Sequence, residues 1–317
     1  MKQDKNEVEK MVIVAHDYYE KNMDQIQIAK ELGLSRPTVS RLLKRALAEK
    51  IVKIEVIDPY RSNPDLAKSL CTHLGLTNVS VISGQSPSDE IIRRNIAYAA
   101  ADYLQGIILP GDIVGIGWGR TMKELASYIK PTDTKDVLFI PLMGGVGQVD
   151  ASFQSSSVLE TISSSFGAKW IQFHVPAMVE NKKLKAGLLE LPDVKQVVQY
   201  WGRMTKAVVG IGVPPFEHQF LFYDYIGEME KLQLSKRGAA GDICMRFFDI
   251  NGEPIQYVKQ DCMNVDFELL KQVKTVIAVA GGKQKIQAII GASRGKYINH
   301  LVTDEYTALH ILEYLHV

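Results

Sequence analysis

The chain has 317 residues, of which 46% are hydrophobic and 23% charged, and its formal net charge is +1. These proportions are ordinary for a folded globular protein, and the length is sufficient for a small domain beside a full-sized one. The near-neutral balance argues against a general polyanion binder. Any contact with nucleic acid must therefore come from a local basic surface.

The first ten residues lack the apolar core of a secretory signal, and no apolar run is long enough to span a bilayer. The three cysteines, Cys71, Cys244 and Cys262, are too few and too scattered for a disulfide framework or a metal-ligand spacing. We therefore expect a cytoplasmic protein with no metal, no cofactor and no membrane partner.

The N-terminal 50 residues have the pattern of a three-helix DNA-binding unit. Apolar residues at helical spacing predict a first helix over residues 8–19. Residues 24–50 then read as a helix-turn-helix, in which Gly33 interrupts the apolar pattern. Ser35 is a natural N-cap for the second helix, and Pro37 falls in its first turn, where a missing N–H costs little. We expect the small side chains at Ala29 and Gly33 to be required sterically, because two helices that cross steeply leave little room between them.

The second helix of this pair divides into an apolar and a basic face. Its apolar stripe consists of Val39, Leu42, Leu43 and Ala46. An ordinary helical hairpin with a solvated basic face would show the same division. A recognition helix is favoured because a turn glycine and a capped helix coincide with five positive residues among the six charged ones of residues 36–50. The predicted DNA-binding residues are Gln25, Ser35, Arg36, Thr38, Ser40, Arg41, Lys44 and Arg45.

A domain boundary is predicted shortly after this unit. Residues 51–57 alternate apolar and charged side chains, which predicts a strand that either forms a wing or begins the next sheet. Residues 58–64 contain two prolines and several polar residues, which is typical of a linker. The expected organisation is a DNA-binding domain over residues 1–57, a linker over 58–64 and a large domain over 65–317.

The large domain alternates short β-rich runs with helical patterns, which predicts a doubly wound, mostly parallel α/β sheet. The clearest helices cover residues 90–104, 121–129 and 305–315. The predicted strands cover residues 79–82, 113–116, 137–142, 170–175, 207–213, 276–280 and 301–303.

Glycine-bearing loops follow three of these predicted strands, at residues 115–121, 143–147 and 281–285. Glycines there allow the backbone to approach an anion at a helix N-terminus, although each loop alone could be a tight turn without a ligand. Because ligands of open α/β sheets bind beyond the C-terminal strand ends, the three loops together favour a small phosphorylated ligand. Residues 241–244 form a fourth candidate loop, in which Asp242 either accepts hydrogen bonds from sugar hydroxyls or caps a turn.

The order of these motifs resembles that of the SorC/DeoR-type family of sugar-responsive bacterial transcriptional regulators, over essentially the whole chain. The resemblance implies a large domain related in fold to phosphosugar isomerases and deaminases. It also implies a phosphorylated sugar or sugar alcohol as effector, and a homotetramer bound to double-stranded operator DNA. The motifs are QIAKELGLSRPTVSRLL (27–43), GDIVGIGWGRTM (111–122), LMGGVG (142–147), GAAGDICMRFFDINGEPI (238–255), VAGGKQKIQAI (279–289) and GKYINHLVTDEYTA (295–308).

The resemblance also implies an effector site, residue by residue. The second loop of that site contains Met143, which has no amine, so an aldehyde sugar cannot be captured there as an imine and non-covalent binding is expected. The implied effector-binding residues are Gly117, Trp118, Gly119, Arg120, Thr121, Met143, Gly144, Gly145, Asp242, Gly282 and Lys285.

Three functions fit these observations. The first, which we favour, is a ligand-gated regulator of a sugar-catabolic operon, either repressor or activator. The second is a phosphosugar isomerase or deaminase with an appended DNA-binding head. Catalysis needs a positioned general base, and His174, His218 and His300 are scattered in the sequence, which leaves Asp242 alone as a plausible base. The third is a constitutive DNA-binding or scaffold protein whose large domain binds no ligand, which the basic loops disfavour.

Overall fold

The computed structural model describes residues 5–21, 23–52, 62–83, 88–134, 136–147, 151–214, 226–256 and 261–317. The chain forms two compact units, Met1–Val56 and Ile57–Val317. Among the described residues, no helix combines the length and the apolar character that a membrane crossing requires.

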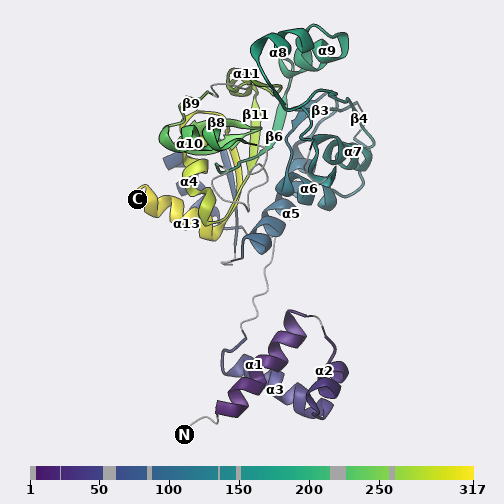
Figure 1. Ribbon diagram of the computed structural model, residues 1–317, viewed down its shortest axis with the longest axis vertical. Helices are drawn as coiled ribbons and strands as arrows, with labels where there is room; N and C mark the ends of the chain where they lie inside the picture. The colour runs from purple at the N-terminus through teal and green to yellow at the C-terminus, as the bar shows by residue number, and fades with distance from the viewer. Residues whose placement is uncertain are drawn as a thin grey trace. The chain divides into compact units, whose positions relative to one another are not determined.

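The small unit consists of α1 (Lys5–Tyr19), α2 (Gln25–Leu32) and α3 (Arg36–Ala48), shown in purple in Figure 1. Asp24 caps α2 in a capping box, because its side chain accepts from the Gln27 backbone while the Gln27 side chain accepts from the Asp24 backbone. Ser35 caps α3 through the Thr38 N–H and a proline lies in the first turn, as predicted. The predicted apolar stripe is buried together with residues of α1 and α2: Met11, Val14, Ala15, Ile28, Ala29, Val39, Leu42, Leu43 and Ala46.

Gly33 is required by backbone conformation, and the steric expectation for it is wrong. It ends α2 in the left-handed region with φ 63°, and its N–H donates to the Ala29 carbonyl. A Cβ built at this position meets no heavy atom within 4 Å, so neighbouring helices do not crowd it.

Replacing Gly33 with alanine is therefore expected to destabilise the small unit by about 1–2 kcal/mol, the cost of a left-handed conformation for an L-residue. Gly106, near the end of a helix in the large unit, also has open space around it but has no positive φ. Its replacement by alanine should instead stabilise the protein slightly. Urea denaturation followed by circular dichroism measures both changes, and equal effects would contradict the conformational explanation.

The predicted strand and linker between the units fall largely outside the described residues. Ile51 and Val52 form a bend packed against the core of the small unit, and residues 53–61 lie outside the described ranges. Ser62 forms an antiparallel bridge with Ile82, and Asn63 caps α4 (Pro64–Leu74). Residues 62–64 therefore fold as part of the large unit.

A seven-stranded parallel sheet forms the centre of the large unit, in the order β1-β12-β11-β6-β2-β3-β4. Each predicted strand corresponds to one of these, which confirms the doubly wound α/β fold. The strand predicted over residues 170–175 is shorter than expected, because Phe173 and Val175 leave the sheet edge and pack in a separate cluster with Val179, Val194 and Met263. The strands are β1 (Asn78–Ile82), β2 (Ile113–Ile116), β3 (Leu138–Pro141), β4 (Lys169–Trp170), β6 (Lys206–Gly210), β11 (Thr275–Val279) and β12 (His300–Asp304).

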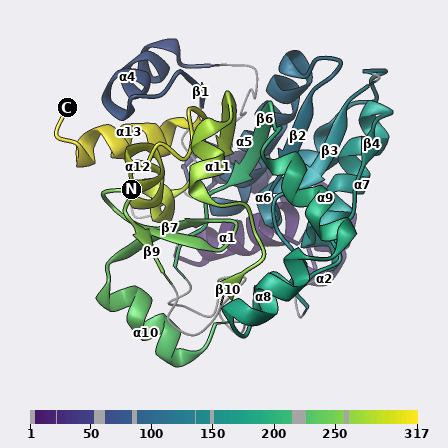
Figure 2. The same ribbon diagram turned by 90° about the horizontal axis from the view of Figure 1, so that it is seen from above.

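Helices cover both faces of this sheet (Figure 2). On one face, α5 (Asp89–Ile107), α6 (Arg120–Tyr128) and α7 (Ser155–Phe166) bury their apolar sides against the strands. On the other face lie α4, α12 (Ile286–Arg294) and α13 (Glu305–Tyr314). The three helices predicted from the sequence correspond to α5, α6 and α13.

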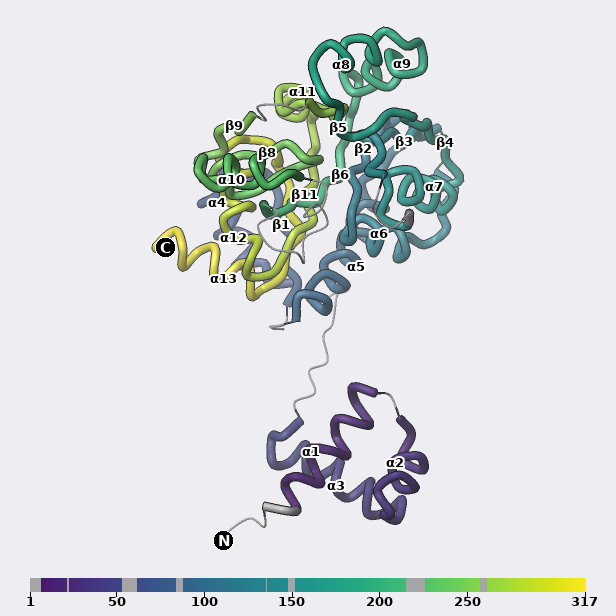
Figure 3. The backbone as a smooth tube through the Cα atoms, viewed as in Figure 1, coloured from purple at the N-terminus to yellow at the C-terminus, as the bar shows by residue number. Residues whose placement is uncertain are grey.

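Smaller elements surround this framework. A three-stranded antiparallel sheet consists of β7 (Ala239–Ile243), β8 (Arg246–Asp249) and β9 (Pro254–Ile255). Helices α8 (Lys182–Leu189) and α9 (Pro192–Trp201) lie together beside β5 (Met178–Val179), as Figure 3 shows. The remaining elements are η1 (Ala151–Phe153), α10 (Glu228–Lys236), β10 (Asp261–Cys262), α11 (Phe267–Gln272) and η2 (Lys283–Lys285).

The segment 241–244, predicted as a loop, is mostly a strand. Gly241 to Ile243 belong to β7, and Cys244 begins the tight turn into β8. Gly241 is needed there because a Cβ would collide with Ala288 of α12 and with the Phe248 ring. Asp242 is therefore held on a packed strand.

Candidate functional site

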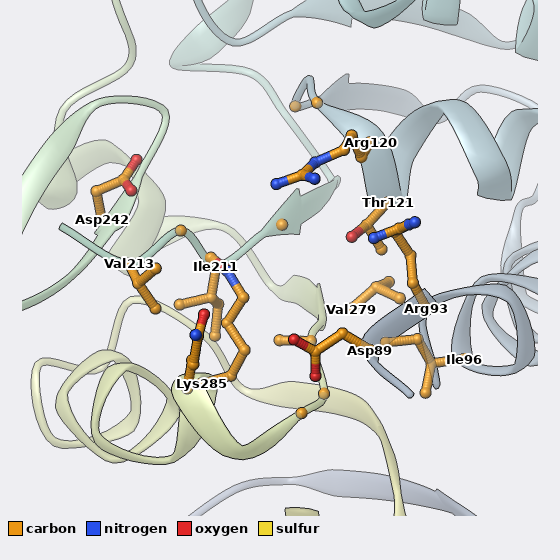
Figure 4. A pocket seen from close by; sticks show the side chains of 18 of the residues that line it. Asp89, Arg93, Ile96, Arg120, Thr121, Ile211, Val213, Asp242, Val279 and Lys285 are labelled. Atoms are coloured by element: carbon orange, nitrogen blue, oxygen red, sulfur yellow. The ribbon is translucent and has the colours of Figure 1, made fainter. Parts of the chain in front are cut away.

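A cavity of about 220 Å³ lies at the C-terminal ends of β2, β6 and β11 (Figure 4). The sheet order reverses between β2 and β6: β3 and β4 continue from β2 in one direction, whereas β11 and β12 continue from β6 in the other. Loops diverge at such a switch point, and open α/β sheets bind their ligands there. The cavity thus occupies the position that the topology favours for a ligand.

One side of the cavity is positively charged. Arg120 and Thr121 begin α6, and Arg93 comes from the second turn of α5; these side chains lie close together in Figure 4. Burial lowers the pKa of Arg120, and the neighbouring charge of Arg93 lowers it further. A bound anion would relieve both effects, and the N-terminus of α6 adds its own positive dipole.

Lys285 contributes a third cation at the start of α12. Its Nζ donates to the Ile211 carbonyl at 2.7 Å. Burial lowers the pKa of Lys285 to about 8, the charges of Arg120 and Arg93 add to this shift, and Asp242 partly opposes it. In the absence of an anion, the amine is therefore mostly charged below about pH 8 and mostly neutral above it.

Asp242 lies on the opposite side of the cavity from Arg93 and Arg120 (Figure 4). Its backbone pairs with Gly212, where a Cβ would overlap the Asp242 carboxylate. Its Oδ2 accepts from the Met245 N–H at 3.0 Å, whereas the buried Oδ1 has no hydrogen-bond partner among the described residues. Burial raises the pKa of Asp242 to about 6, although the Met245 N–H and the Lys285 charge oppose the shift.

The structure brings together eight of the residues predicted to bind the effector. They come from the ends of two strands, β2 and β11, and from β7, so the predicted convergence of distant motifs occurs in the fold. The residues that line the cavity are Gly117, Trp118, Gly119, Arg120, Thr121, Asp242, Gly282 and Lys285.

The second glycine loop lies apart from this cavity. Met143 and Gly145 line a separate and smaller one of about 50 Å³. A Cβ on Gly144 would overlap the backbone of Val175 and Pro176, and its N–H donates to the Met263 carbonyl. Gly144 allows close packing of backbone segments, and Met143, Gly144 and Gly145 are not part of the cavity that holds the other eight residues.

Sequence reasoning missed several lining residues. Asp89 and Arg93 reach the cavity from the first two turns of α5, whose N-cap is Ser88. Residues 210–213 also line it, because β6 ends at Gly210 and not at residue 213 as predicted. The sequence contained a signal for each group of residues. Ser88 is a capping serine before α5, and residues 210–213 are a glycine-bearing segment after a strand.

The small unit presents the predicted DNA-binding residues on α2 and α3. Ser35, Arg36, Arg41 and Lys44 are exposed, whereas Gln25, Thr38 and Ser40 are half-buried. Arg45 pairs with Glu7 of α1, and with Glu49 at 2.8 Å. Its guanidinium thus links α3 to α1 within the unit.

Comparisons with known proteins cover both units. Residues 58–313 match the Sugar-bind family of sugar-binding domains, and residues 6–49 match region 4 of sigma-70. The chain is 31% identical over 306 residues to the sorbitol operon regulator of Klebsiella pneumoniae, covering 96% of this chain and 97% of that protein. It is 30% identical to the deoxyribonucleoside regulator of Bacillus subtilis (strain 168), with the same coverage.

Solved structures agree with these matches. The crystal structure of full-length SorC from Klebsiella pneumoniae superposes with a TM-score of 0.75 and covers 98% of this chain and 99% of that chain at 31% identity. A probable sor operon regulator from Shigella flexneri gives a TM-score of 0.73 over 79% of this chain and 99% of that chain, at 30% identity. The chain therefore belongs to the SorC family of sugar-responsive, DNA-binding transcriptional regulators.

Proposed function

We propose that this protein regulates a sugar-catabolic operon in the cytoplasm, and that a phosphorylated sugar or sugar alcohol controls it by binding non-covalently in the large cavity. The observation that supports this most strongly is the division of the cavity into a cationic side and a side bearing an unpartnered carboxylate oxygen. A sugar phosphate has the matching two ends, an anion and a set of hydroxyl donors.

The phosphate is assigned to the side formed by Gly117–Thr121, Arg93 and Lys285. Glycine backbone at a helix N-terminus, together with charge-assisted donors, is a common anion site in proteins. The hydroxyl end is assigned to Asp242, whose buried Oδ1 gains a hydrogen bond when a sugar hydroxyl donates to it. Among the described residues that line the cavity, Lys285 is the one amine, and its Nζ donates a hydrogen bond to the Ile211 carbonyl. If binding is non-covalent, borohydride treatment with ribose 5-phosphate should add no more mass to the wild type than to Lys285→Met.

The operator is assigned to the exposed face of α3, with Arg36 and Arg41 as candidate base readers and Lys44 as a phosphate contact. Arg45 is a weaker candidate, because its guanidinium pairs with Glu7 and Glu49. A homotetramer would present several recognition helices to successive half-sites. Light scattering of the full chain, with and without operator DNA, tests this assembly.

A thermal-shift screen tests the effector assignment. The panel includes sorbitol 6-phosphate, ribose 5-phosphate and glucosamine 6-phosphate, each beside its unphosphorylated sugar. We expect at least one sugar phosphate to raise the melting temperature while its parent sugar does not, because a ligand stabilises the state that binds it. A panel without any shift would contradict the proposal.

Binding is also expected to depend on pH through Lys285. Its pKa of about 8 in the free protein rises when a phosphate is bound, so binding takes up a proton near that pH. Between pH 7 and 8 the amine is already charged and Asp242, with a pKa of about 6, is ionised, so affinity is nearly constant. Above pH 8 affinity should fall by about tenfold per pH unit. Calorimetric titrations at pH 7, 8 and 9 measure this, and a flat profile would remove Lys285 from the phosphate site.

A further inference from the structure

The cavity loop is hydrogen-bonded to the start of α13. The Gly282 N–H donates to Thr307 Oγ1 at 2.7 Å, and this hydroxyl donates to Asp304 Oδ2 at 2.5 Å. Asp304 Oδ1 in turn accepts from the Thr307 N–H at 3.0 Å and caps the helix. Thr307 and Asp304 are both buried, so water does not compete for these bonds.

The same loop has no room to move independently of its neighbours. A Cβ on Gly281 would overlap Asp304 Oδ2, so the carboxylate lies directly against the loop backbone. Gly282 has φ 102°, and a Cβ there would come within 2.8 Å of the Asp89 carboxylate. A ligand that repositions Gly281 and Gly282 therefore acts directly on the contacts between this loop and the start of α13.

A further hydrogen bond connects the start of α13 to Asn63, the N-cap residue of α4. Glu305 follows Asp304, and its Oε1 accepts from Asn63 Nδ2 at 3.0 Å. Asn63 is fixed at three points: its Oδ1 caps α4 through the Leu66 N–H, its N–H donates to the Val81 carbonyl, and its Nδ2 holds Glu305. The chain that comes from the DNA-binding unit enters α4 through Asn63.

We propose that effector binding is communicated to the DNA-binding unit through this relay, which we define as Gly282, Thr307, Asp304, Glu305 and Asn63. The inference rests on the proposed function, because it needs a ligand in the cavity. A ligand that immobilises the Gly281–Gly282 backbone also restricts the motion of the start of α13. The hydrogen bond between Glu305 and Asn63 extends this restriction to the first turn of α4. The relay supplies the differential contact that a ligand-dependent change in operator affinity requires.

Asn63→Ser isolates the last bond of the relay. Serine still caps α4, because its hydroxyl can accept from the Leu66 N–H, but its side chain is one bond too short to place a donor where Asn63 Nδ2 meets Glu305. Glu305→Ala removes the acceptor of the same hydrogen bond. Asn181→Ser is the matched control, because Asn181 likewise caps a helix, α8, through the Leu184 N–H, at a site outside the relay. Thermal denaturation of each variant verifies that it folds.

Hydrogen exchange of the full-length protein, with sorbitol 6-phosphate and separately with inorganic phosphate, gives the local readout. In the wild type, exchange of residues 281–285 and 64–70 should slow by about threefold or more. In N63S and E305A the effect at 281–285 should remain while the effect at 64–70 disappears. The change in operator affinity caused by sorbitol 6-phosphate should also fall by about fivefold in both variants and not in N181S.

Two outcomes would overturn the inference in distinguishable ways. If N63S and E305A keep the full response at residues 64–70 and on the operator, the relay is wrong and the proposed function stands. If neither probe slows exchange at residues 281–285 of the wild type, the effector assignment itself fails and the relay fails with it.

Discussion

Replacing Lys285 with methionine is expected to weaken sugar phosphate binding by roughly 30- to 1000-fold, which corresponds to about 2–4 kcal/mol. Methionine retains the length of the aliphatic stem and removes the charge. The Lys285 Nζ lies in a cavity where burial and two arginines already lower its pKa, so its charged form gains strongly from a bound phosphate. Calorimetric titration with the sugar phosphate that gives the largest thermal shift measures the loss.

Lys283→Met is the matched control for this change. Lys283 lies two residues away on the same short helix, is exposed and does not line the cavity. Its replacement should leave affinity within about twofold, since an exposed charge in water contributes little. Equal losses in the two variants would indicate a general electrostatic effect and would contradict a phosphate site built around Lys285.

Replacing Arg41 with alanine is expected to cost about 1–3 kcal/mol of operator binding and to relax specificity at one base pair, as for an arginine that donates to guanine. Lys44→Ala should instead weaken binding to all sequences alike and reduce the salt slope by about one unit. Both side chains are exposed on α3. Fluorescence anisotropy on the operator and on single-base variants, over a series of salt concentrations, separates the two effects.

Lys10→Ala controls for the net charge of the unit, because Lys10 is exposed on α1 and outside the helix-turn-helix. It should change operator affinity much less than either α3 variant. Should Arg41→Ala weaken operator and random DNA equally, Arg41 would be a phosphate contact and base reading would pass to Arg36.

Much of the fold was predictable because the apolar runs in the sequence are the segments that the fold buries. The strands of the central sheet are short apolar runs next to glycine-bearing turns, and all seven were located. The small antiparallel sheet was not, since β7 contains Gly241 and Asp242, which are typical of loops. The tertiary contacts with Ala288 of α12 and with the Phe248 ring explain why a glycine is needed inside that strand.

The candidate site was predictable where a residue's role follows from its position after a strand. Arg120 and Lys285 fall at such positions, and the cavity contains both. The loop at Met143 has the same pattern, yet Gly144 serves close packing against residues 175 and 176. The sequence pattern cannot separate these uses of glycine, because both demand a missing side chain. Arg93 was missed because it enters the site from α5, where the sequence signal is a capping serine and not a glycine-bearing loop.

The most direct test of the account measures operator affinity while sugar phosphates are added. The operator is selected from random DNA with the full-length protein, and anisotropy is recorded for the wild type and for K285M. A sugar phosphate that shifts the melting temperature should change operator affinity by about fivefold or more in the wild type, and K285M should not respond at the same concentration. Constant operator affinity, with the same compound bound in the cavity, would contradict control of DNA binding by this site.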